Sequence, residues 1–317
     1  MRATPMGADE FAREVTGFDV ASATEDEIGE LRTHLHRHRV LVLREQSLSP
    51  HQYQLFMEHF GRPIPHVLQN LTVRGFPSIL TISDYVEADG TPTGVLDGGS
   101  YWHADMSYLQ DLGIVTSLYA LRAAERSGGT AFADLAPALE LMASRPDLLE
   151  LLGCESVDEV LALDVDHRFG NRRALRDDTA AKQSLSREQH AQLPGARHKL
   201  IETHPRTGTP GLFAPVGSAM SVVGLSDAQS DLALDALEEF VLKELPGYTH
   251  RYQPGDLVIW DNMSTLHRGT GVGATRDLET SRLLHRINVK YGGAPAEPVA
   301  LPHQKNSLAR FNGRGTQ

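Results

Sequence analysis

The sequence predicts a mixed fold in which a distorted double-sheet β-barrel is decorated by helices. Segments with strand patterns lie on both flanks of the motif Trp102-His103-Ala104-Asp105, and helical patterns cluster outside them. Residues i and i+2 of a strand face the same side, so His103 and Asp105 can point together, and His267 can reach them from a strand paired opposite. Two sheets explain this convergence better than a parallel doubly wound sheet does.

Helices are predicted where apolar residues recur every three or four positions. In the first helix Thr24 is a suitable N-cap, and Ile28, Leu31 and Leu35 share one face. The pair Ser49-Pro50 opens the second helix in the same way. The predicted helices span residues 23–37, 49–60, 135–144, 146–152 and 226–245.

Strands are predicted from short apolar runs that end at turn residues. The run between Arg39 and Arg44 has the pattern of a buried strand and separates the first two helices. The predicted strands span residues 39–44, 79–82, 115–121, 129–134, 199–203, 248–252, 256–260 and 283–291.

Two segments match neither pattern, and we expect both to be lids of one domain that spans residues 1–317. A loop-rich lid is expected around residues 86–100, which are rich in Gly, Asp and Thr and lead into the His103 motif. A second lid or insertion is expected around residues 166–199, where arginine and lysine outnumber the acids. This basic segment is compatible with an anionic substrate, but a solvated, mobile lid also explains it.

The composition excludes several classes of protein. The net charge of -11 disfavours nucleic acid and anionic membranes as partners. With Cys154 as the only cysteine, no intramolecular disulfide and no zinc-thiolate site can form, which fits a reducing compartment. The N-terminus lacks a secretory pattern and no apolar run is long enough to cross a bilayer, so we expect a cytoplasmic protein. The sequence leaves open whether it is a monomer or a homo-oligomer.

His103, Asp105 and His267 predict a metal site. Two neutral imidazoles and one carboxylate leave other positions of the metal open, as in non-haem Fe(II) oxygenases. The same donors also hold catalytic zinc in hydrolases. A third alternative is an inactive relative with a structural metal, although structural zinc sites have four protein ligands and no fourth ligand is evident here.

The order and spacing of several motifs resemble the taurine and 2,4-dichlorophenoxyacetate dioxygenase family of Fe(II)- and 2-oxoglutarate-dependent oxygenases. The resemblance covers most of the chain. Its motifs are Phe60-Gly61-Arg62-Pro63, Trp102-His103-Ala104-Asp105, Gly128-Gly129-Thr130, Tyr252-Gln253-Pro254-Gly255-Asp256, Trp260-Asp261-Asn262, His267-Arg268-Gly269-Thr270-Gly271 and Arg282-Leu283-Leu284-His285-Arg286.

The resemblance implies a double-stranded β-helix core, with His103, Asp105 and His267 as iron ligands. It also implies that Thr130 and Arg282 bind the distal carboxylate of 2-oxoglutarate. A buried dicarboxylate needs a cation opposite its far end, and an arginine with a hydroxyl donor supplies one. Taken alone, Thr130 would be read as an ordinary strand residue and Arg282 as a surface arginine.

Three further residues are candidates for binding the substrate. Arg286 lies four residues beyond Arg282, so on a strand both face one side, and the resemblance implies that it contacts an acidic group. His66 has the spacing of a substrate-binding histidine, with a polar loop histidine as the alternative, and Met106 replaces a small valine beside Asp105.

The substrate of the resembled taurine enzymes is not expected here. Gly99 and Gln69 stand where those enzymes have a substrate-contacting asparagine and tyrosine. Asp105 also argues against a halogenase, which needs that position vacant for chloride. We expect an enzyme that uses Fe(II), 2-oxoglutarate and O2 to hydroxylate a C–H bond of a small, acidic substrate, with succinate and CO2 as coproducts.

Overall fold

The computed structural model describes residues 1–7, 10–96, 99–111, 113–123, 128–176, 193, 195–271 and 273–291. Its largest sheet has nine strands in the order β1-β2-β3-β15-β7-β17-β6-β5, with β4 also paired to β17. The strands are β1 (Arg2–Pro5), β2 (Arg13–Thr16), β3 (Val40–Leu43), β4 (Arg62–Pro63), β5 (Thr72–Val73), β6 (Phe76–Ser83), β7 (Ile114–Arg122), β15 (Leu257–Asp261) and β17 (Leu283–Lys290). All neighbours are antiparallel except β2 and β3.

A second sheet of three strands faces the large one. Its order is β14-β8-β16, with β14 (Gly247–His250), β8 (Thr130–Asp134) and β16 (Thr265–Gly269). Phe132 of β8, Trp260 of β15 and Leu284 of β17 belong to one buried apolar cluster, which fills the space between the sheets. The alternate residues Ile287 and Val289 of β17 instead pack in a cluster with residues of the first two helices, because successive strand residues point to opposite faces.

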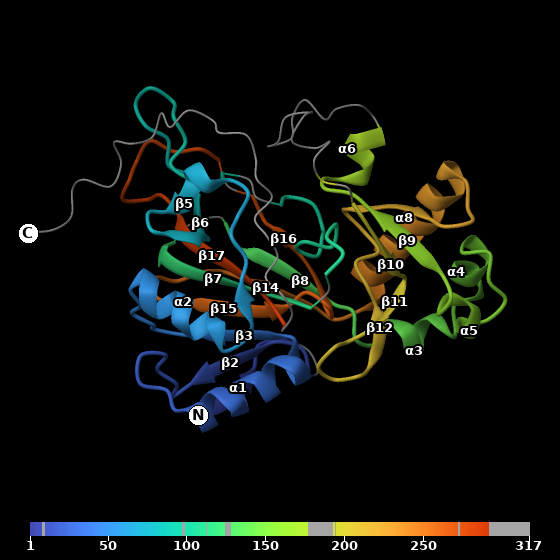
Figure 1. Cartoon of the computed structure of the whole chain (residues 1–317), viewed down its shortest axis with the longest axis horizontal. Helices are drawn as coiled ribbons and strands as arrows, with labels where there is room; N and C mark the ends of the chain where they lie inside the picture. The colour runs from blue at the N-terminus through green and yellow to red at the C-terminus, as the bar shows by residue number, and fades with distance from the viewer. Residues whose placement is uncertain are drawn as a thin grey trace, which may run out of the picture.

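Those helices are α1 (Glu25–His38) and α2 (Pro50–Glu58), and Figure 1 shows them on one side of the large sheet. Each begins with a capping box, formed by Thr24 with Glu27 and by Ser49 with Gln52. The predicted helices at residues 23–37, 49–60, 146–152 and 226–245 are confirmed by α1, α2, α4 (Pro146–Leu151) and α8 (Asp227–Glu244).

The helix predicted over residues 135–144 is too long. The structure has α3 (Ala138–Met142) alone, because the Leu135 N–H still donates to the Ser264 carbonyl and Pro137 follows in the turn. The strand predicted over residues 199–203 is also wrong: β10 (Ala196–Lys199) and β11 (Ile201–Thr203) lie in different sheets on either side of Leu200.

The segment predicted as an irregular basic lid contains regular structure at both ends. β9 (Asp164–His167) pairs with β10 and with β13 (Ala219–Val222), and α6 (Arg172–Arg176) lies near α8. A two-stranded sheet of β11 and β12 (Pro210–Leu212) is adjacent, and the short helices α5 (Val157–Val160) and η1 (Gln69–Leu71) complete the described elements. Residues 177–192 of the predicted lid lie outside the described part of the chain.

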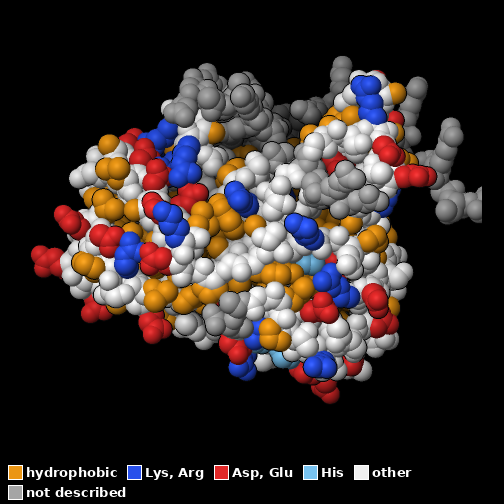
Figure 2. Space-filling model, turned by 180° about the vertical axis from the view of Figure 1, so that it is seen from behind, with side chains coloured by type: hydrophobic (Ala, Val, Ile, Leu, Met, Phe, Trp, Pro, Cys, Tyr) orange, Lys and Arg blue, Asp and Glu red, His pale blue; other side chains and the backbone are white. Residues whose placement is uncertain are grey.

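Most arginines of this basic segment that the structure describes are already paired with acids. Arg172 and Arg173 form ion pairs with Asp235 of α8, and Arg176 pairs with Asp227. Arg197 pairs with Asp166 in the same way. Figure 2 likewise shows acidic and basic side chains interspersed over the face opposite to that of Figure 1. These four arginines are therefore held in ion pairs with acidic residues of the fold.

The predicted class, a sheet-dominated fold with flanking helices, is confirmed. One domain over residues 1–317 with lids around 86–100 and 166–199 stays a prediction. Among the helices within the described ranges, none has the length and apolar character needed to cross a membrane.

Candidate metal centre and adjoining pocket

The structure brings His103, Asp105 and His267 together. His103 and His267 form an antiparallel bridge, in which each N–H donates to the carbonyl of the other at 3.0 and 2.9 Å. The distance from His103 Nε2 to Asp105 Oδ1 is 3.6 Å, and that from His267 Nε2 to Asp105 Oδ2 is 3.8 Å. These separations are too long for hydrogen bonds but suit three donors that each lie about 2.1 Å from one ion.

Hydrogen bonding orients one imidazole for a metal, and burial keeps the other neutral. His103 Nδ1 donates to the Tyr101 carbonyl at 2.8 Å, so its lone pair is on Nε2, which faces Asp105. Burial and the neighbouring His103 hold the pKa of His267 well below its usual range, so His267 is neutral. The donor set therefore fits a divalent metal, with His103 Nε2 and the neutral His267 ring both close to Asp105.

Asp105 is fixed by polar side chains on the large sheet. Its Oδ2 accepts from Thr116 Oγ1 at 2.9 Å and from Asn288 Nδ2 at 3.0 Å, and its N–H donates to Asn262 Oδ1 at 3.0 Å. Although burial opposes ionisation, chiefly the charge of the neighbouring Arg286 guanidinium holds the pKa of Asp105 well below its usual range. The carboxylate is thus charged and oriented before any metal binds.

Sequence reasoning did not single out the residues that hold Asp105. Asn262 was noted only as part of a motif, and Thr116 and Asn288 lie inside strands predicted as apolar. All three are buried. The available signal was a polar residue within a buried strand, since such a residue needs a hydrogen-bonding partner.

Two residues beside the ligands have unusual backbone conformations. Met106 has φ +58°, which is left-handed and rare for a residue with a side chain. Gly99 has φ +108°, and a Cβ on it would lie 2.3 Å from His103 Cε1 and 2.9 Å from His103 Nε2. Gly99 is therefore required for the packing of its backbone against the imidazole of His103.

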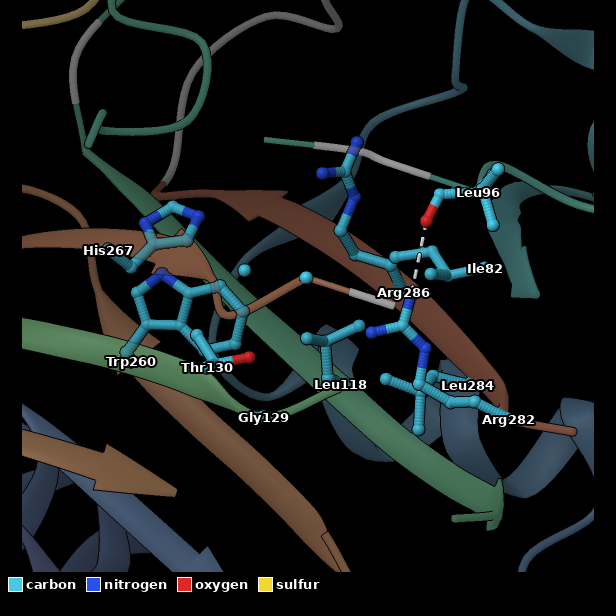
Figure 3. A pocket seen from close by; sticks show the side chains of 12 residues that line it. Ile82, Leu96, Leu118, Gly129, Thr130, Trp260, His267, Arg282, Leu284 and Arg286 are labelled. Atoms are coloured by element: carbon cyan, nitrogen blue, oxygen red, sulfur yellow. Dashed lines mark hydrogen bonds between the residues drawn. The ribbon is translucent and has the colours of Figure 1, made fainter. Parts of the chain in front are cut away.

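A pocket of about 520 Å³, including its open mouth, adjoins this centre (Figure 3). His267, Thr130, Arg282 and Arg286 line it together with the apolar side chains of Ile82, Leu96, Leu118, Trp260 and Leu284. Thr130 Oγ1 lies 2.9 Å from the Tyr252 hydroxyl. Arg282 donates to the carbonyls of Gly128 at 3.3 Å and Leu96 at 3.2 Å, and its N–H to Asp84 Oδ1 at 2.7 Å.

The structure also places Arg286 beside His66. Arg286 Nη2 lies 3.1 Å from His66 Nε2, and Arg286 Nη1 lies 3.5 Å from Asp105 Oδ1. Burial, aided by the Arg286 charge, lowers the pKa of His66 to about 3, so the ring is neutral. Met106 follows Asp105 in the chain and is partly exposed. Arg286, in contact with both His66 and Asp105, therefore links His66 to the metal centre.

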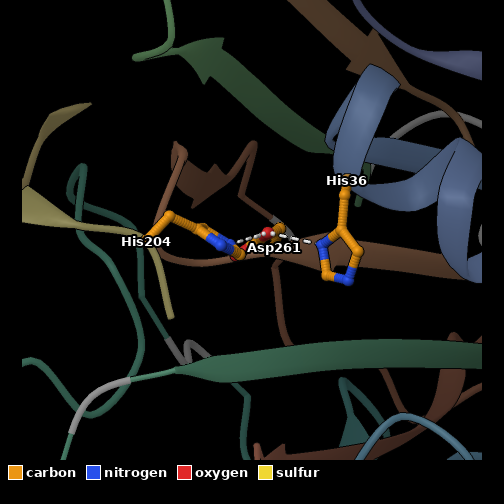
Figure 4. Close-up of side chains that lie close together, drawn as sticks. All are labelled: His36, His204 and Asp261. Atoms are coloured by element: carbon orange, nitrogen blue, oxygen red, sulfur yellow. Dashed lines mark hydrogen bonds and ion pairs between the residues drawn. The ribbon is translucent and has the colours of Figure 1, made fainter. Parts of the chain in front are cut away.

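A second group of two histidines and one aspartate, which sequence reasoning missed, lies elsewhere in the fold (Figure 4). His36 of α1 and His204 approach Asp261 of β15 from either side. His204 Nε2 lies 2.7 Å from Asp261 Oδ2, and His204 Nδ1 accepts from the N–H groups of Arg206 and Thr207, both at 3.1 Å. His204 therefore carries its hydrogen on Nε2 and donates it to Asp261, which leaves no lone pair there for a metal.

An open centre of two histidines and one carboxylate beside a pocket with cationic residues defines a mononuclear non-haem metal enzyme. Residues 2–288 match the family described as Taurine catabolism dioxygenase TauD, TfdA family, and the chain belongs to this family. The predicted enzyme class, a dioxygenase that depends on Fe(II), 2-oxoglutarate and O2, is therefore confirmed at the level of the family.

Similar proteins include two curated relatives. The alpha-ketoglutarate-dependent 2,4-dichlorophenoxyacetate dioxygenase of Cupriavidus pinatubonensis is 29% identical over 293 residues, which cover 86% of this chain and 94% of that protein. Pentalenolactone F synthase of Streptomyces arenae is 30% identical over 269 residues, which cover 83% of this chain and 86% of that protein.

Solved structures share the fold. A taurine dioxygenase from Burkholderia xenovorans superposes with a TM-score of 0.69 at 23% identity, over 92% of this chain and 91% of that one. AAD-2, solved in complex with Mn(II) and N-oxalylglycine, superposes with a TM-score of 0.69 at 20% identity, over 94% of this chain and 99% of that one.

Proposed function

We propose that this protein uses Fe(II), 2-oxoglutarate and O2 to hydroxylate a C–H bond of a small organic substrate that carries an acidic group. The observation that carries the proposal is the convergence of His103, Asp105 and His267 at one end of a pocket that also contains Thr130 and Arg282. A zinc hydrolase would leave Thr130 and Arg282 without a role. We also propose that the two facing sheets form the double-stranded β-helix core that the resemblance implies.

In this proposal His103, Asp105 and His267 hold three positions of the iron, and bound iron, 2-oxoglutarate and O2 supply the oxidising chemistry. The Arg282 guanidinium and the Thr130 hydroxyl bind the distal carboxylate of 2-oxoglutarate. Apolar side chains of the pocket, among them Leu118 and Leu284, exclude water from this region. Succinate and CO2 are the expected coproducts.

The acidic group on the substrate is inferred from the contact between His66 and Arg286. His66 Nδ1 accepts from the Leu68 N–H at 3.1 Å, while His66 Nε2 faces the Arg286 guanidinium at 3.1 Å. A neutral imidazole accepts at one nitrogen only, so both of its nitrogens cannot be satisfied by donors. A carboxylate, sulfonate or phosphate oxygen between His66 and Arg286 would accept from both and resolve this conflict.

Tyr101 and Tyr108 extend this side of the centre. The Tyr101 ring lies 5.2 Å from the His103 ring, and the Tyr108 ring contacts Phe169 edge-on at 5.0 Å. Burial raises the pKa of Tyr101 to about 12, and the Asp105 charge contributes in the same direction. We propose that these rings, with Met106, contact the body of the substrate.

The class of reaction is tested by anaerobic spectroscopy. Addition of Fe(II) and 2-oxoglutarate together should produce a visible metal-to-ligand charge-transfer band that neither gives alone. Folded protein that binds iron but shows no such band with 2-oxoglutarate would contradict the cosubstrate assignment.

The substrate class is tested by succinate release with matched pairs of acids and their primary amides. The relatives that act on 2,4-dichlorophenoxyacetate and phenoxypropionate, together with an alkylsulfatase, suggest aryloxy and alkyl acids for the panel. We expect release with acids and at least tenfold less with the matched amides. Release with amides alone would refute the role of Arg286 and His66. A cytoplasmic location, the lack of nucleic-acid and membrane partners, and the oligomeric state stay predictions.

A further inference from the structure

We infer that Tyr252 is a positioning residue for 2-oxoglutarate: its hydroxyl donates to Thr130 Oγ1 and thereby directs the single Thr130 hydroxyl proton towards the distal carboxylate. The two oxygens lie 2.9 Å apart in the buried end of the pocket. The inference rests on the proposed function and adds a residue to the pair Thr130 and Arg282. Tyr252 acts through Thr130 and does not itself contact the cosubstrate.

The direction of this hydrogen bond follows from the number of protons. A threonine hydroxyl has one hydrogen, so if Thr130 donates to a carboxylate it can only accept from Tyr252. Within the described part of the chain, the hydrogen bond to Thr130 is the one that the Tyr252 hydroxyl makes. Burial holds the pKa of Tyr252 well above its usual range, and the nearby Arg282 charge only partly opposes this. The phenol is therefore a proton donor at any physiological pH.

A tight turn places Tyr252 at the pocket. The Asp256 N–H donates to the Gln253 carbonyl at 3.0 Å, and Gly255 has φ +87°, so Pro254 and Gly255 form the centre of a type II turn. The Gly255 N–H then donates to the Ala120 carbonyl of β7 at 2.8 Å. The Tyr-Gln-Pro-Gly-Asp motif thus fixes the start of β15 and the position of Tyr252 together.

The Tyr252 ring is also held from the side. The His250 ring meets it edge-on, with centroids 4.7 Å apart and planes at 86°. His250 is fixed in turn by Asp256 Oδ2 at 2.9 Å and by the Tyr248 hydroxyl at 2.9 Å. These contacts leave the phenol little freedom to rotate, and its hydroxyl stays directed at Thr130.

A glycine brings the two hydroxyls within reach. His250 of β14 pairs with Thr130 of β8, and a Cβ on the preceding Gly129 would lie 2.3 Å from the His250 carbonyl oxygen. Only glycine permits this approach of the two backbones. The Gly-Gly-Thr motif and the Tyr-Gln-Pro-Gly-Asp motif therefore form one structural unit around the distal end of the pocket.

The test is Tyr252→Phe, with Tyr119→Phe as the matched control. Tyr119 is equally buried, but its hydroxyl bonds to the backbone of Gln46 and Leu48 on the other face of the large sheet. Binding is measured anaerobically with Fe(II), from the charge-transfer band and from the rise in Tm with ligand. The two ligands are 2-oxoglutarate and 2-oxopentanoate, which has the same keto acid end without the distal carboxylate.

We expect Tyr252→Phe to weaken 2-oxoglutarate binding about fivefold to tenfold, which corresponds to the loss of one hydrogen bond in a network that holds a charged group. The same substitution should weaken 2-oxopentanoate binding less than about twofold, because this ligand lacks the distal carboxylate. Tyr119→Phe should change neither. The KM for 2-oxoglutarate should rise, with little change in kcat at saturation. In a Thr130→Val background, Tyr252→Phe should add nothing, because the hydroxyl through which it acts is gone.

Several results would overturn the inference. Equal weakening for both ligands would show that Tyr252 has a general structural role, and an additive effect in the Thr130→Val background would show that it acts independently of Thr130. Unchanged 2-oxoglutarate binding by a folded Tyr252→Phe variant would also refute it. If instead the wild-type protein shows no band with 2-oxoglutarate, the proposed function itself has failed.

Discussion

Among the residues that the structure describes, two groups combine two histidines with one aspartate, and one of these two has the geometry of a metal site. In the first group, His103 and His267 approach different oxygens of Asp105 at 3.6 and 3.8 Å. In the second, His204 lies 2.7 Å from Asp261 Oδ2. The longer distances leave room for an ion, whereas the shorter one is an ordinary hydrogen bond.

The neighbours of each histidine explain this difference. His103 Nδ1 faces a carbonyl and must donate, which frees Nε2 to bind a metal. His204 Nδ1 faces two N–H groups and must accept, which keeps a proton on Nε2. The same residue types can therefore form a metal-ligand set or a hydrogen-bonded cluster. The difference depends on whether a backbone carbonyl or a backbone N–H faces the histidine Nδ1.

Replacement of the aspartate in each group by asparagine should give the largest difference between the two groups in iron binding. We expect Asp105→Asn to lower Fe(II) affinity at least 100-fold and to abolish succinate release, because it removes the only anionic ligand of the three. Asp261→Asn should bind one iron with an affinity within threefold of wild type. Iron titration by competition with a chelator measures both, and a large loss of iron from Asp261→Asn would mean that the second group also binds metal.

Substitution of a glycine beside each group tests the same comparison through the backbone, and its effects should be smaller. Gly99→Ala should weaken iron binding about 10- to 100-fold, because its Cβ would displace the His103 imidazole. Gly208 follows His204, has φ +70°, and has open space where a Cβ would lie. Gly208→Ala should therefore cost only about 1 kcal/mol of folding stability, from the left-handed backbone, and leave iron binding unchanged.

Urea unfolding and iron titration of both glycine variants check this prediction. If Gly99→Ala binds iron as wild type does, Gly99 does not limit the position of His103. If Gly208→Ala loses iron, the loop after His204 and the metal centre are coupled.

The convergence of the first group could be predicted from sequence because strand periodicity is local. The i and i+2 spacing predicted that His103 and Asp105 point together, and the strand after Trp260 supplies His267. The predicted strand at His103 is wrong, however, because His103 makes only an isolated bridge with His267 and Asp105 lies in a turn. The same periodicity placed Arg282 and Arg286 in one pocket.

The second group could not be predicted, because tertiary packing alone brings it together. His36 lies on a helix, His204 at the start of a turn and Asp261 at the end of a strand, and no spacing relates them. Similarly, β9 and β13 have four residues each, and β9 includes two aspartates that pair with Arg197 and Lys199, which masks the strand pattern.

Acid pH should lower the stability of the protein through Asp261 of the second group, and this is the smallest of the expected effects. Although burial opposes ionisation, His204 and His36 lower the pKa of Asp261 from 3.8 to about 2. Because the folded pKa lies below the unfolded one, the charged carboxylate contributes about 2 kcal/mol of stability above pH 5, and this contribution is lost as the pH falls towards 2. About half should be gone by pH 3. Urea midpoints measured from pH 7 to pH 3 should therefore fall more steeply for wild type than for Asp261→Asn, and parallel curves would show that Asp261 is not held as a carboxylate by its two histidines.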